Sequence, residues 1–274
     1  DDEHTDAIHD HHHGRHHEGH APAGEELGPH QVRAGLVEAL LLVLLPGEGP
    51  EWCAVLPRVW RDRDEPALRT LLERARALGF TGVLIGNLGH LPLVRGLNFH
   101  LYGDYGLNVF NSRSLAYLKD KELESACVSF ELRFAQIRDL KKVLRAEAIV
   151  YGRLPLMITE NCLVQNETGC RLDRQGPCVP EDGPCRCGQP NVLVDRTGAA
   201  FPLLPAYGHR TEIQNSKPLY LADRPEHRRL GLAYARLRFT TETAEECVSV
   251  VQNYLDAAPA AGDFTRGLYE RGVE

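Results

Sequence analysis

The chain has 274 residues, of which 43% are hydrophobic and 25% are charged. These are ordinary values for a globular protein, and they exclude a collagen, a mucin-like stalk and a fully disordered chain. The length allows one large domain or two modest ones. The net charge is −7, and residues 1–30, with eight acids and one arginine, account for all of it. The remainder of the chain is neutral, so its net charge does not indicate a nucleic-acid partner.

The sequence predicts neither a membrane span nor a signal peptide. The longest apolar run, residues 39–45, ends before Pro46 and is far shorter than the ~20 residues that cross a bilayer. We interpret it as a buried strand or helix. The first residues have no basic segment and no apolar core, so we expect a cytoplasmic protein without membrane contact. The single methionine, Met157, is internal, which indicates a processed chain or a fragment.

Residues 1–30 are of low complexity and contain nine of the 13 histidines. A segment with so few apolar side chains cannot form a packed core, and we expect a disordered tail. Histidine tracts hold zinc or nickel loosely. We favour a linker or tail without a specific metal role.

From Trp52 onward, short apolar segments alternate with amphipathic helical segments. Gly79 should end the helix predicted at 68–78, and we expect Ser112 to cap the helix predicted at 115–121. A strand–helix unit roughly every 20–30 residues is typical of a parallel sheet or barrel. The predicted strands are 53–57, 81–86, 107–110, 127–130 and 148–151, and the predicted helices are 68–78, 115–121 and 134–144.

After Tyr151 this rhythm is interrupted. Residues 162–190 are rich in Cys, Gly and Pro, and residues 192–222 read as short antiparallel strands with a turn at 196–198. A strand at 230–239 and a helix with a Thr243–Glu246 capping box then resume the alternation of strands and helices. The predicted fold class is α/β: the later part of a TIM-like (β/α) barrel with a Cys-rich insert and a small antiparallel β patch.

These changes of texture divide the chain into four segments. A complete eight-fold barrel needs about 250 residues. We therefore expect this chain to lack the N-terminal half of the barrel and to associate with that half as a partner. The segments are a disordered His/Asp-rich tail at 1–30, the C-terminal part of the βα barrel at 31–161, the Cys-rich insert with the antiparallel patch at 162–229, and a final βα unit with the C-terminal tail at 230–274.

Eight cysteines are present, and five of them fall in one short window. Disulfides would suit a small secreted domain. A structural zinc site needs two close ligand pairs, and only Cys185 and Cys187 form one. An iron–sulfur cluster needs four thiolates at looser spacing, and we favour it over zinc and over unligated or oxidised thiols. The five are Cys162, Cys170, Cys178, Cys185 and Cys187, whereas Cys53, Cys127 and Cys247 occupy core positions as plain buried thiols.

Cys162 comes after the predicted strand 148–151. In a βα barrel the carboxyl ends of the strands carry the chemistry, so a cluster held there would face the barrel mouth. The alternative is a loop held together by metal for stability alone, because metal binding contributes folding free energy.

Several motifs resemble the collagenase-like peptidase family, peptidase family U32, over roughly residues 51–274. The resemblance implies a barrel whose later part this chain contains. The motifs are GNLG at 86–89, GDYGLNVFNS at 103–112, YGRLPLMITENC at 151–162, NETGC at 166–170, LVDRTGAAFPLLP at 193–205, EIQNSKPLYLAD at 212–223 and FTRGLYERGV at 264–273.

The resemblance has two implications for function. The family name denotes proteases of unassigned catalytic type. Relatives bind a 4Fe–4S cluster through four cysteines and take part in oxygen-independent hydroxylation of a ribosomal RNA cytidine, of tRNA uridines or of the ubiquinone ring. YGRLPLM and DRTGAAFPLL are most similar to the branch that hydroxylates ribosomal RNA.

The same resemblance implies a set of cluster ligands. Cys162 and Cys170 match the first two cysteines, and Cys185 or Cys187 matches the third. Many relatives have a fourth cysteine where this chain has His209, and histidine ligation is known for iron–sulfur centres. The alternative fourth ligands are Cys178, in an additional stretch at 171–184, and Cys185, with Cys187 then as the third ligand.

Three hypotheses follow. The first is an iron–sulfur-dependent hydroxylase of bases in ribosomal RNA or tRNA. The second is a peptidase, for which the chain has neither a Gly-x-Ser-x-Gly elbow nor a His-Glu-x-x-His helix but could pair Cys162 with His209. The third is a non-catalytic fragment that needs a partner half-barrel. Weak catalytic candidates are His90, His100 and Arg153, and candidate phosphate contacts are Arg224, Arg228, Arg229, Arg236 and Arg238.

Overall fold

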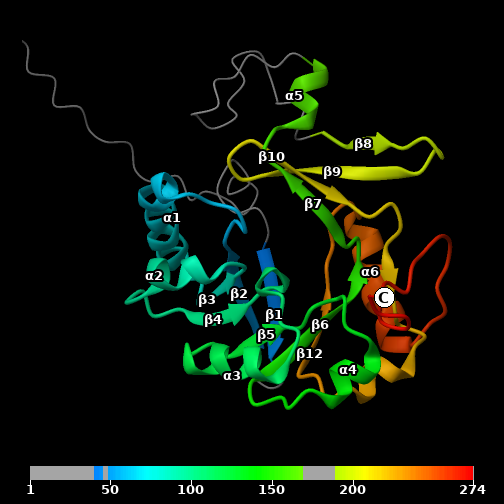
Figure 1. The fold of residues 1–274 in the computed structure, drawn as a ribbon, viewed down its shortest axis with the longest axis horizontal. Helices are drawn as coiled ribbons and strands as arrows, with labels where there is room; N and C mark the ends of the chain where they lie inside the picture. Colours follow the sequence, from blue (N-terminus) through cyan, green and yellow to red (C-terminus); the bar gives the residue numbers. More distant parts are fainter. Residues whose placement is uncertain (1–39, 46–48, 169–188, 274) are drawn as a thin grey trace, which may run out of the picture.

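A computed structural model describes residues 40–45, 49–168 and 189–273. It has two sheets: a curled, mostly parallel sheet flanked by helices, and a separate antiparallel sheet beside it (Figure 1). The predicted disordered tail and four of the five clustered cysteines lie outside the described residues. The mixed α/β class, the parallel half-barrel and the antiparallel patch are therefore confirmed.

Six parallel strands form the half-barrel in one continuous order. The apolar run predicted as a strand or helix is the strand β1 (Leu40–Leu45), which pairs antiparallel with the first of the six. A short strand, β11 (Leu219–Tyr220), pairs antiparallel with the end of β6. The six are β2 (Gly49–Val55), β3 (Gly82–Ile85), β4 (His100–Gly103), β5 (Ser125–Cys127), β6 (Arg145–Gly152) and β12 (Tyr234–Leu237).

Apolar side chains of the outer face of the sheet pack against the helices. Leu68 and Leu72 of α1 (Glu65–Ala77) belong to the same buried cluster as Val83 of β3. Gly79, with a left-handed φ of 87°, follows the end of α1 as predicted. The other flanking helices are α2 (Leu91–Val94), α3 (Ser112–Asp120), α4 (Phe134–Asp139) and α6 (Ala244–Asp256), the last of which has the predicted capping box.

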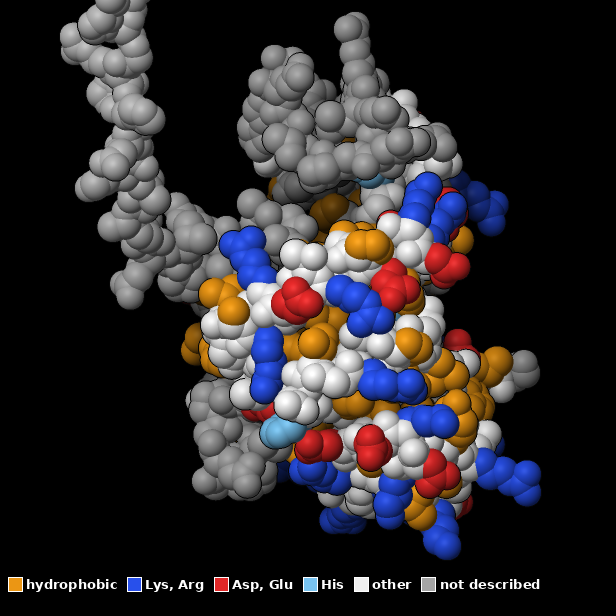
Figure 2. All heavy atoms as spheres, turned by 90° about the vertical axis from the view of Figure 1, so that its left-hand side faces the viewer, with side chains coloured by type: hydrophobic (Ala, Val, Ile, Leu, Met, Phe, Trp, Pro, Cys, Tyr) orange, Lys and Arg blue, Asp and Glu red, His pale blue; other side chains and the backbone are white. Residues whose placement is uncertain are grey.

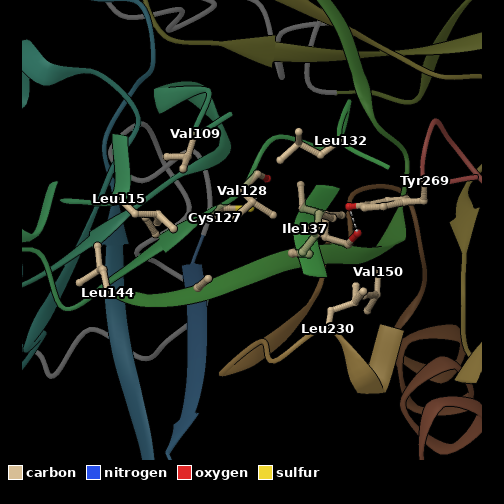
Figure 3. Packing of buried hydrophobic residues seen from close by; sticks show 14 of the residues in the cluster. Val109, Leu115, Cys127, Val128, Leu132, Ile137, Leu144, Val150, Leu230 and Tyr269 are labelled. Carbon is tan, nitrogen blue, oxygen red and sulfur yellow. Dashed lines mark hydrogen bonds between the residues drawn. The ribbon is translucent and has the colours of Figure 1, made fainter. Parts of the chain in front are cut away.

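A second buried cluster lies between α3, α4 and the later strands (Figure 3). Leu115 of α3 and Ile137 of α4 are fully buried in it. Tyr269 is only 1% exposed, and its hydroxyl donates to the carbonyl oxygen of Ile149 in β6 at 2.6 Å. The C-terminal motif around Tyr269 thus anchors the end of the chain to the half-barrel.

The antiparallel sheet has the order β7 (Pro155–Thr159), β10 (Arg210–Gln214), β9 (Ala200–Ala206) and β8 (Asn191–Val194). The predicted turn joins β8 to β9, where the carboxylate of Asp195 accepts from the amides of Thr197 and Ala199 at 2.8 and 3.0 Å. A short helix, α5 (Leu163–Thr168), contributes apolar side chains to one face.

Some predicted boundaries differ from the structure. Residues 107–110 form no regular strand, and only Val109 makes an isolated bridge to Val128. The helix predicted at 134–144 ends at Asp139, because its last apolar residues pack on the same core from an extended segment. Asn111, not Ser112, caps α3, since its side-chain oxygen accepts from the amides of the next turn.

Two strands belong to a different sheet from the one that the predicted segment boundaries imply. β7 belongs to the antiparallel sheet although it precedes residue 162, and β11 belongs to the half-barrel although it lies within 162–229. Gly152, the last residue of β6, has a φ of 116°, and the carbonyl oxygen of Arg238 is only 2.0 Å from where a Cβ would be. A larger residue does not fit there, and the chain leaves the half-barrel at this point.

Candidate active site at the carboxyl edge of the half-barrel

Side chains from both sheets meet where the parallel strands end. Arg58 follows β2, Tyr105 follows β4 and Arg238 follows β12, whereas Glu212 and Gln214 lie on β10. We call these five residues the mouth cluster. The Glu212 carboxylate accepts from Arg238 at 2.7 Å and from Arg58 at 3.4 Å. One carboxylate of the antiparallel sheet is therefore shared by two arginines of the half-barrel.

Both arginines also contact the ring of Tyr105. The guanidinium carbons of Arg58 and Arg238 are 5.1 and 5.7 Å from the centre of its ring, within the range of cation–π contacts. Burial, followed by the charge of Glu212, raises the pKa of Tyr105. Its hydroxyl therefore stays protonated at neutral pH.

Two glycines of the sequence motifs lie next to Arg58, and one of them is required by the close packing. A Cβ at Gly106 would lie 2.5 Å from the carbonyl oxygen of Gly86 and 2.7 Å from Cδ of Arg58. At Gly86 itself a Cβ would find its nearest neighbours at 3.7 Å, an ordinary contact distance. The close approach of the GNLG and GDYG loops thus requires glycine at Gly106 in particular.

A buried charge network lies beneath the mouth cluster. Arg236 of β12 donates to the carboxylates of Asp104, after β4, and Glu147, within β6, and all three are less than 10% exposed. Burial raises the pKa of Glu147, while the adjacent Arg236 opposes that shift. Asp104 and Glu147 were not predicted as site residues from the sequence. For Glu147, its position inside the apolar run AEAIVY could have indicated a buried charge.

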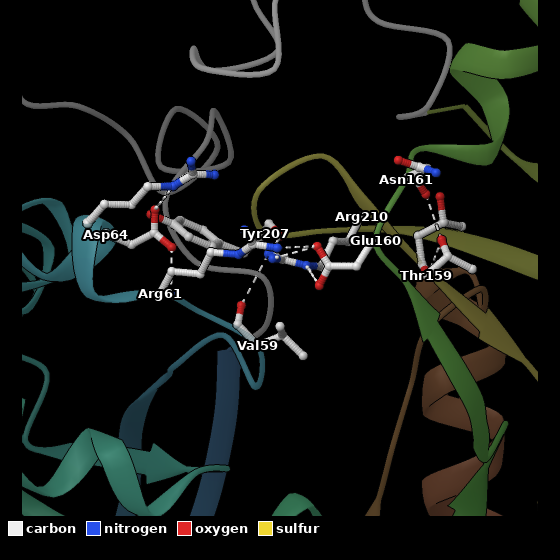
Figure 4. A network of polar contacts seen from close by, with 10 residues as sticks. Val59, Arg61, Asp64, Thr159, Glu160, Asn161, Tyr207 and Arg210 are labelled. Atoms are coloured by element: carbon white, nitrogen blue, oxygen red, sulfur yellow. Dashed lines mark hydrogen bonds and ion pairs between the residues drawn. The ribbon is translucent and has the colours of Figure 1, made fainter.

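A second bridge joins the sheets at Glu160, directly after β7 (Figure 4). Arg210 of β10 binds its carboxylate through two hydrogen bonds of 3.1 Å, and Arg61, beyond β2, adds one of 2.8 Å. The hydrogen bond from Arg210 is the main reason that the pKa of Glu160 is lowered. The start of α5 is thereby tied to the carboxyl edge of the half-barrel.

A cleft of about 640 Å³ opens beside Arg58, between the loops that follow β3 and β4 and the first turns of α3. We call it the loop cleft. Two arginines line it, and none of its lining residues is acidic. The lining comprises Arg58, Gly86, Asn87, Leu88, Gly106, Leu107, Val109, Arg113, Ser114, Tyr117 and Leu118.

Cys162 follows Glu160 by two residues and is 9% exposed. It packs with Val164, Leu203 and Ile213 on the antiparallel sheet. Between the predicted strand 148–151 and Cys162 the structure has β7, which carries the chain into the antiparallel sheet. Of the five clustered cysteines it alone is described, since Cys170, Cys178, Cys185 and Cys187 lie outside the described residues.

His209 lies in the turn between β9 and β10, with a left-handed φ of 60°. The pairing of Thr211 with Thr159, continued by the contact of Arg210 with Glu160, brings this turn to the end of the sheet where Cys162 lies. Within the described ranges, no group of three or more His, Cys, Asp or Glu side chains could hold a metal ion. The ligand set therefore stays a prediction.

The three weak catalytic candidates do not converge. His90 is fully buried, and its Nε2 lies 3.1 Å from the carbonyl oxygen of Pro57. His100 begins β4 and contacts Glu51 at 2.9 Å, at the amino edge of the sheet and away from the carboxyl ends of the strands. Arg153 donates to the carbonyl oxygen of Asn215 at 3.0 Å in the connection between the sheets.

The arginines expected to contact phosphate are mostly engaged within the protein. Arg236 is buried in the charge network and Arg238 binds Glu212, so the expectation is wrong for Arg236. Arg224 pairs with Glu270 at 3.0 Å and Arg228 donates to the carbonyl oxygen of Tyr254 at 2.7 Å. Arg229 is exposed, in a 3₁₀ turn that precedes β12 and is remote from its carboxyl end.

The surface carries no dominant charge on the face formed by α1 and α2, where basic, acidic and hydrophobic side chains are interspersed (Figure 2). This agrees with the neutral body of the sequence. Among the described helices, none has the length and apolar character needed to cross a bilayer.

The loop geometry predicts different outcomes for two matched substitutions. Gly106→Ala should displace Arg58 or the Gly86 carbonyl and lower the free energy of unfolding by about 1–3 kcal/mol, the usual cost of overpacking. Gly86→Ala should change it by less than about 1 kcal/mol. Urea unfolding of both variants measures the difference, and equal losses would contradict the proposed path of Arg58.

The burial of His90 predicts a pH dependence. Burial lowers its pKa from 6.5 to about 4, so the unfolded chain binds a proton in this range that the folded chain does not. Stability is fully present above pH 6.5 and should fall by up to about 3 kcal/mol as the pH drops to 4. Urea unfolding between pH 7 and 4 should show a smaller decline for His90→Gln than for the wild type. Parallel curves would refute this role.

Comparison with known proteins adds a family assignment. No curated protein and no solved structure matches the chain. The sequence model of peptidase family U32 matches residues 48–191, more than half of the chain, from β2 to the beginning of β8. The matched region includes both glycine loops, Arg58, Tyr105 and Cys162. With this match added to the motifs quoted above, we conclude that the chain belongs to peptidase family U32.

Proposed function

We propose that the protein is an iron–sulfur-dependent enzyme that hydroxylates bases in RNA without using molecular oxygen. The observation that carries the proposal is the position of Cys162. This thiol lies at the end of the antiparallel sheet, two residues from Glu160, whose carboxylate contacts Arg61 beyond β2. A cofactor held there would lie beside the carboxyl edge of the half-barrel, where barrel enzymes carry out chemistry.

The donor chemistry suits such a cofactor. Thiolates are the ligands of iron–sulfur clusters. The chain supplies Cys162, Cys170 and either Cys185 or Cys187, and the fourth ligand would be His209, Cys178 or the second cysteine of the 185/187 pair. A bound 4Fe–4S cluster would supply redox chemistry. Arg58 and Arg238 would hold negative charge of the substrate near it, and the protonated Tyr105 hydroxyl could donate a hydrogen bond. Zinc fits less well because only Cys185 and Cys187 are closely spaced.

We further propose that the half-barrel is the later part of a TIM-like barrel. In the described part of the chain, β12 pairs along one edge only, with β6. An open edge strand favours pairing with another strand. Additional βα units, from a longer form of this chain or from a partner, would cover it. The cytoplasm would keep the cluster thiols reduced.

Peptide hydrolysis is the second candidate, and the family name supports it. The specific observation is that Cys162 and the His209 turn reach the same end of the antiparallel sheet. A thiol with a histidine base is a known nucleophile pair. In this case Cys162 would attack a peptide carbonyl and no cluster would be needed.

The test is anaerobic purification followed by iron and sulfide assays and visible spectroscopy. The wild type should contain iron and acid-labile sulfide in equal amounts and absorb visible light. Cys162→Ala should lose most of both and lose base hydroxylation of RNA, measured by mass spectrometry, while retaining its fold by circular dichroism. Cys247→Ala is the matched control and should resemble the wild type. Cys247, on α6, is partly exposed and not buried as predicted, whereas Cys53 and Cys127 are buried.

The opposite outcome is equally specific. A colourless wild-type protein that cleaves peptides, and loses this cleavage in Cys162→Ala, would replace the hydroxylase proposal with the peptidase.

A further inference from the structure

We infer that the loop cleft binds the sugar–phosphate backbone of a single-stranded RNA, with Arg113 on a phosphate and Tyr117 beneath a base. This inference rests on the proposed function, because it assigns part of the RNA site, but it concerns residues distinct from the cysteines. Arg113 is not among the arginines that the sequence predicted as phosphate contacts.

The first argument is charge. Arg58 and Arg113 line the cleft, and no Asp or Glu does. Arg58 shares the Glu212 carboxylate with Arg238, so these three side chains together carry an excess positive charge. In the described part of the chain, the guanidinium of Arg113 is exposed and has no ion pair or hydrogen bond with another side chain. A guanidinium with its donors available to solvent is suited to bind a phosphate.

The second argument is the neighbouring aromatic surface. Tyr117 lies one turn after Arg113 on α3 and is 47% exposed, and Leu88 on the opposite side of the cleft is 46% exposed. Lys121 holds its ammonium group 5.1 Å from the Tyr117 ring centre and adds a third cation nearby. Exposed aromatic rings beside cations are typical of surfaces that bind single-stranded nucleic acid, because bases stack on the ring while the cations follow the backbone.

The third argument is size and location. A cleft of about 640 Å³ lies in the range of small-molecule sites and can hold a nucleotide unit. Arg58 is common to the loop cleft and the mouth cluster. A strand bound along the cleft would therefore pass the carboxyl edge of the half-barrel, where the reacting base has to be presented.

The experiment measures binding of a fluorescently labelled, mixed-sequence single-stranded RNA by anisotropy at several salt concentrations. Arg113→Gln should weaken binding roughly tenfold and reduce the slope of log affinity against log salt by about one, the signature of one lost phosphate contact. Tyr117→Leu should weaken binding roughly fivefold or more without changing that slope, because stacking carries no charge. Arg74→Gln, an exposed arginine on the outer helix α1, is the control and should bind as the wild type does.

Thermal melting and visible absorption of the same samples separate folding and cluster content from binding. RNA binding by the wild type that is unchanged in Arg113→Gln would overturn the inference and leave the proposed function standing. Arg113-dependent binding of an acidic peptide in place of RNA would overturn it as well and would favour the peptidase. Loss of the cluster with Arg113-dependent RNA binding intact would contradict the proposed function alone.

Discussion

The shared ion pair of Glu212 with Arg58 and Arg238 is the contact on which the arrangement of the two sheets depends. The Glu212 side chain is 12% exposed and that of Arg238 16%. A partly buried carboxylate without its partner costs several kcal/mol, whereas the bound pair is satisfied by geometry and hydrogen bonds. The antiparallel sheet is therefore held in one position over the carboxyl edge, and Cys162, which it carries, is held with it.

The buried network below has a different role. Asp104 and Glu147 share one guanidinium, that of Arg236, in a region closed to water. Burial is the main cause that raises the pKa of Glu147, because it disfavours the charged carboxylate. The charge of Asp104 adds to this shift, and Arg236 opposes it. The network joins β4, β6 and β12 across the interior of the half-barrel. It supports the floor of the site, and Arg113, the exposed arginine that lines the loop cleft, is the cation open to a ligand.

Much of the fold could be predicted from local pattern, whereas little of the site could. Alternating strands and helices predicted the parallel sheet, and the capping box at Thr243 and the turn at 196–198 were placed correctly, because each depends on neighbouring residues. The membership of β7 in the antiparallel sheet depends on its pairing with β10, about 50 residues later in the sequence. The role of Glu212 could not be predicted either, because its partners Arg58 and Arg238 are 154 and 26 residues away in the sequence. Residues such as Arg113 are recognisable only once two loops have been brought together.

The central claim is that the Glu212 carboxylate fixes the antiparallel sheet over the half-barrel. Hydrogen–deuterium exchange of Glu212→Gln tests it most directly, with Glu226→Gln, an exposed acid before β12, as the control. Loss of the charge should speed exchange of the amides in β7, β9 and β10 while leaving β3 and β4 as slow as in the wild type. Glu226→Gln should exchange as the wild type does. Unchanged exchange in the antiparallel strands of Glu212→Gln would contradict the account.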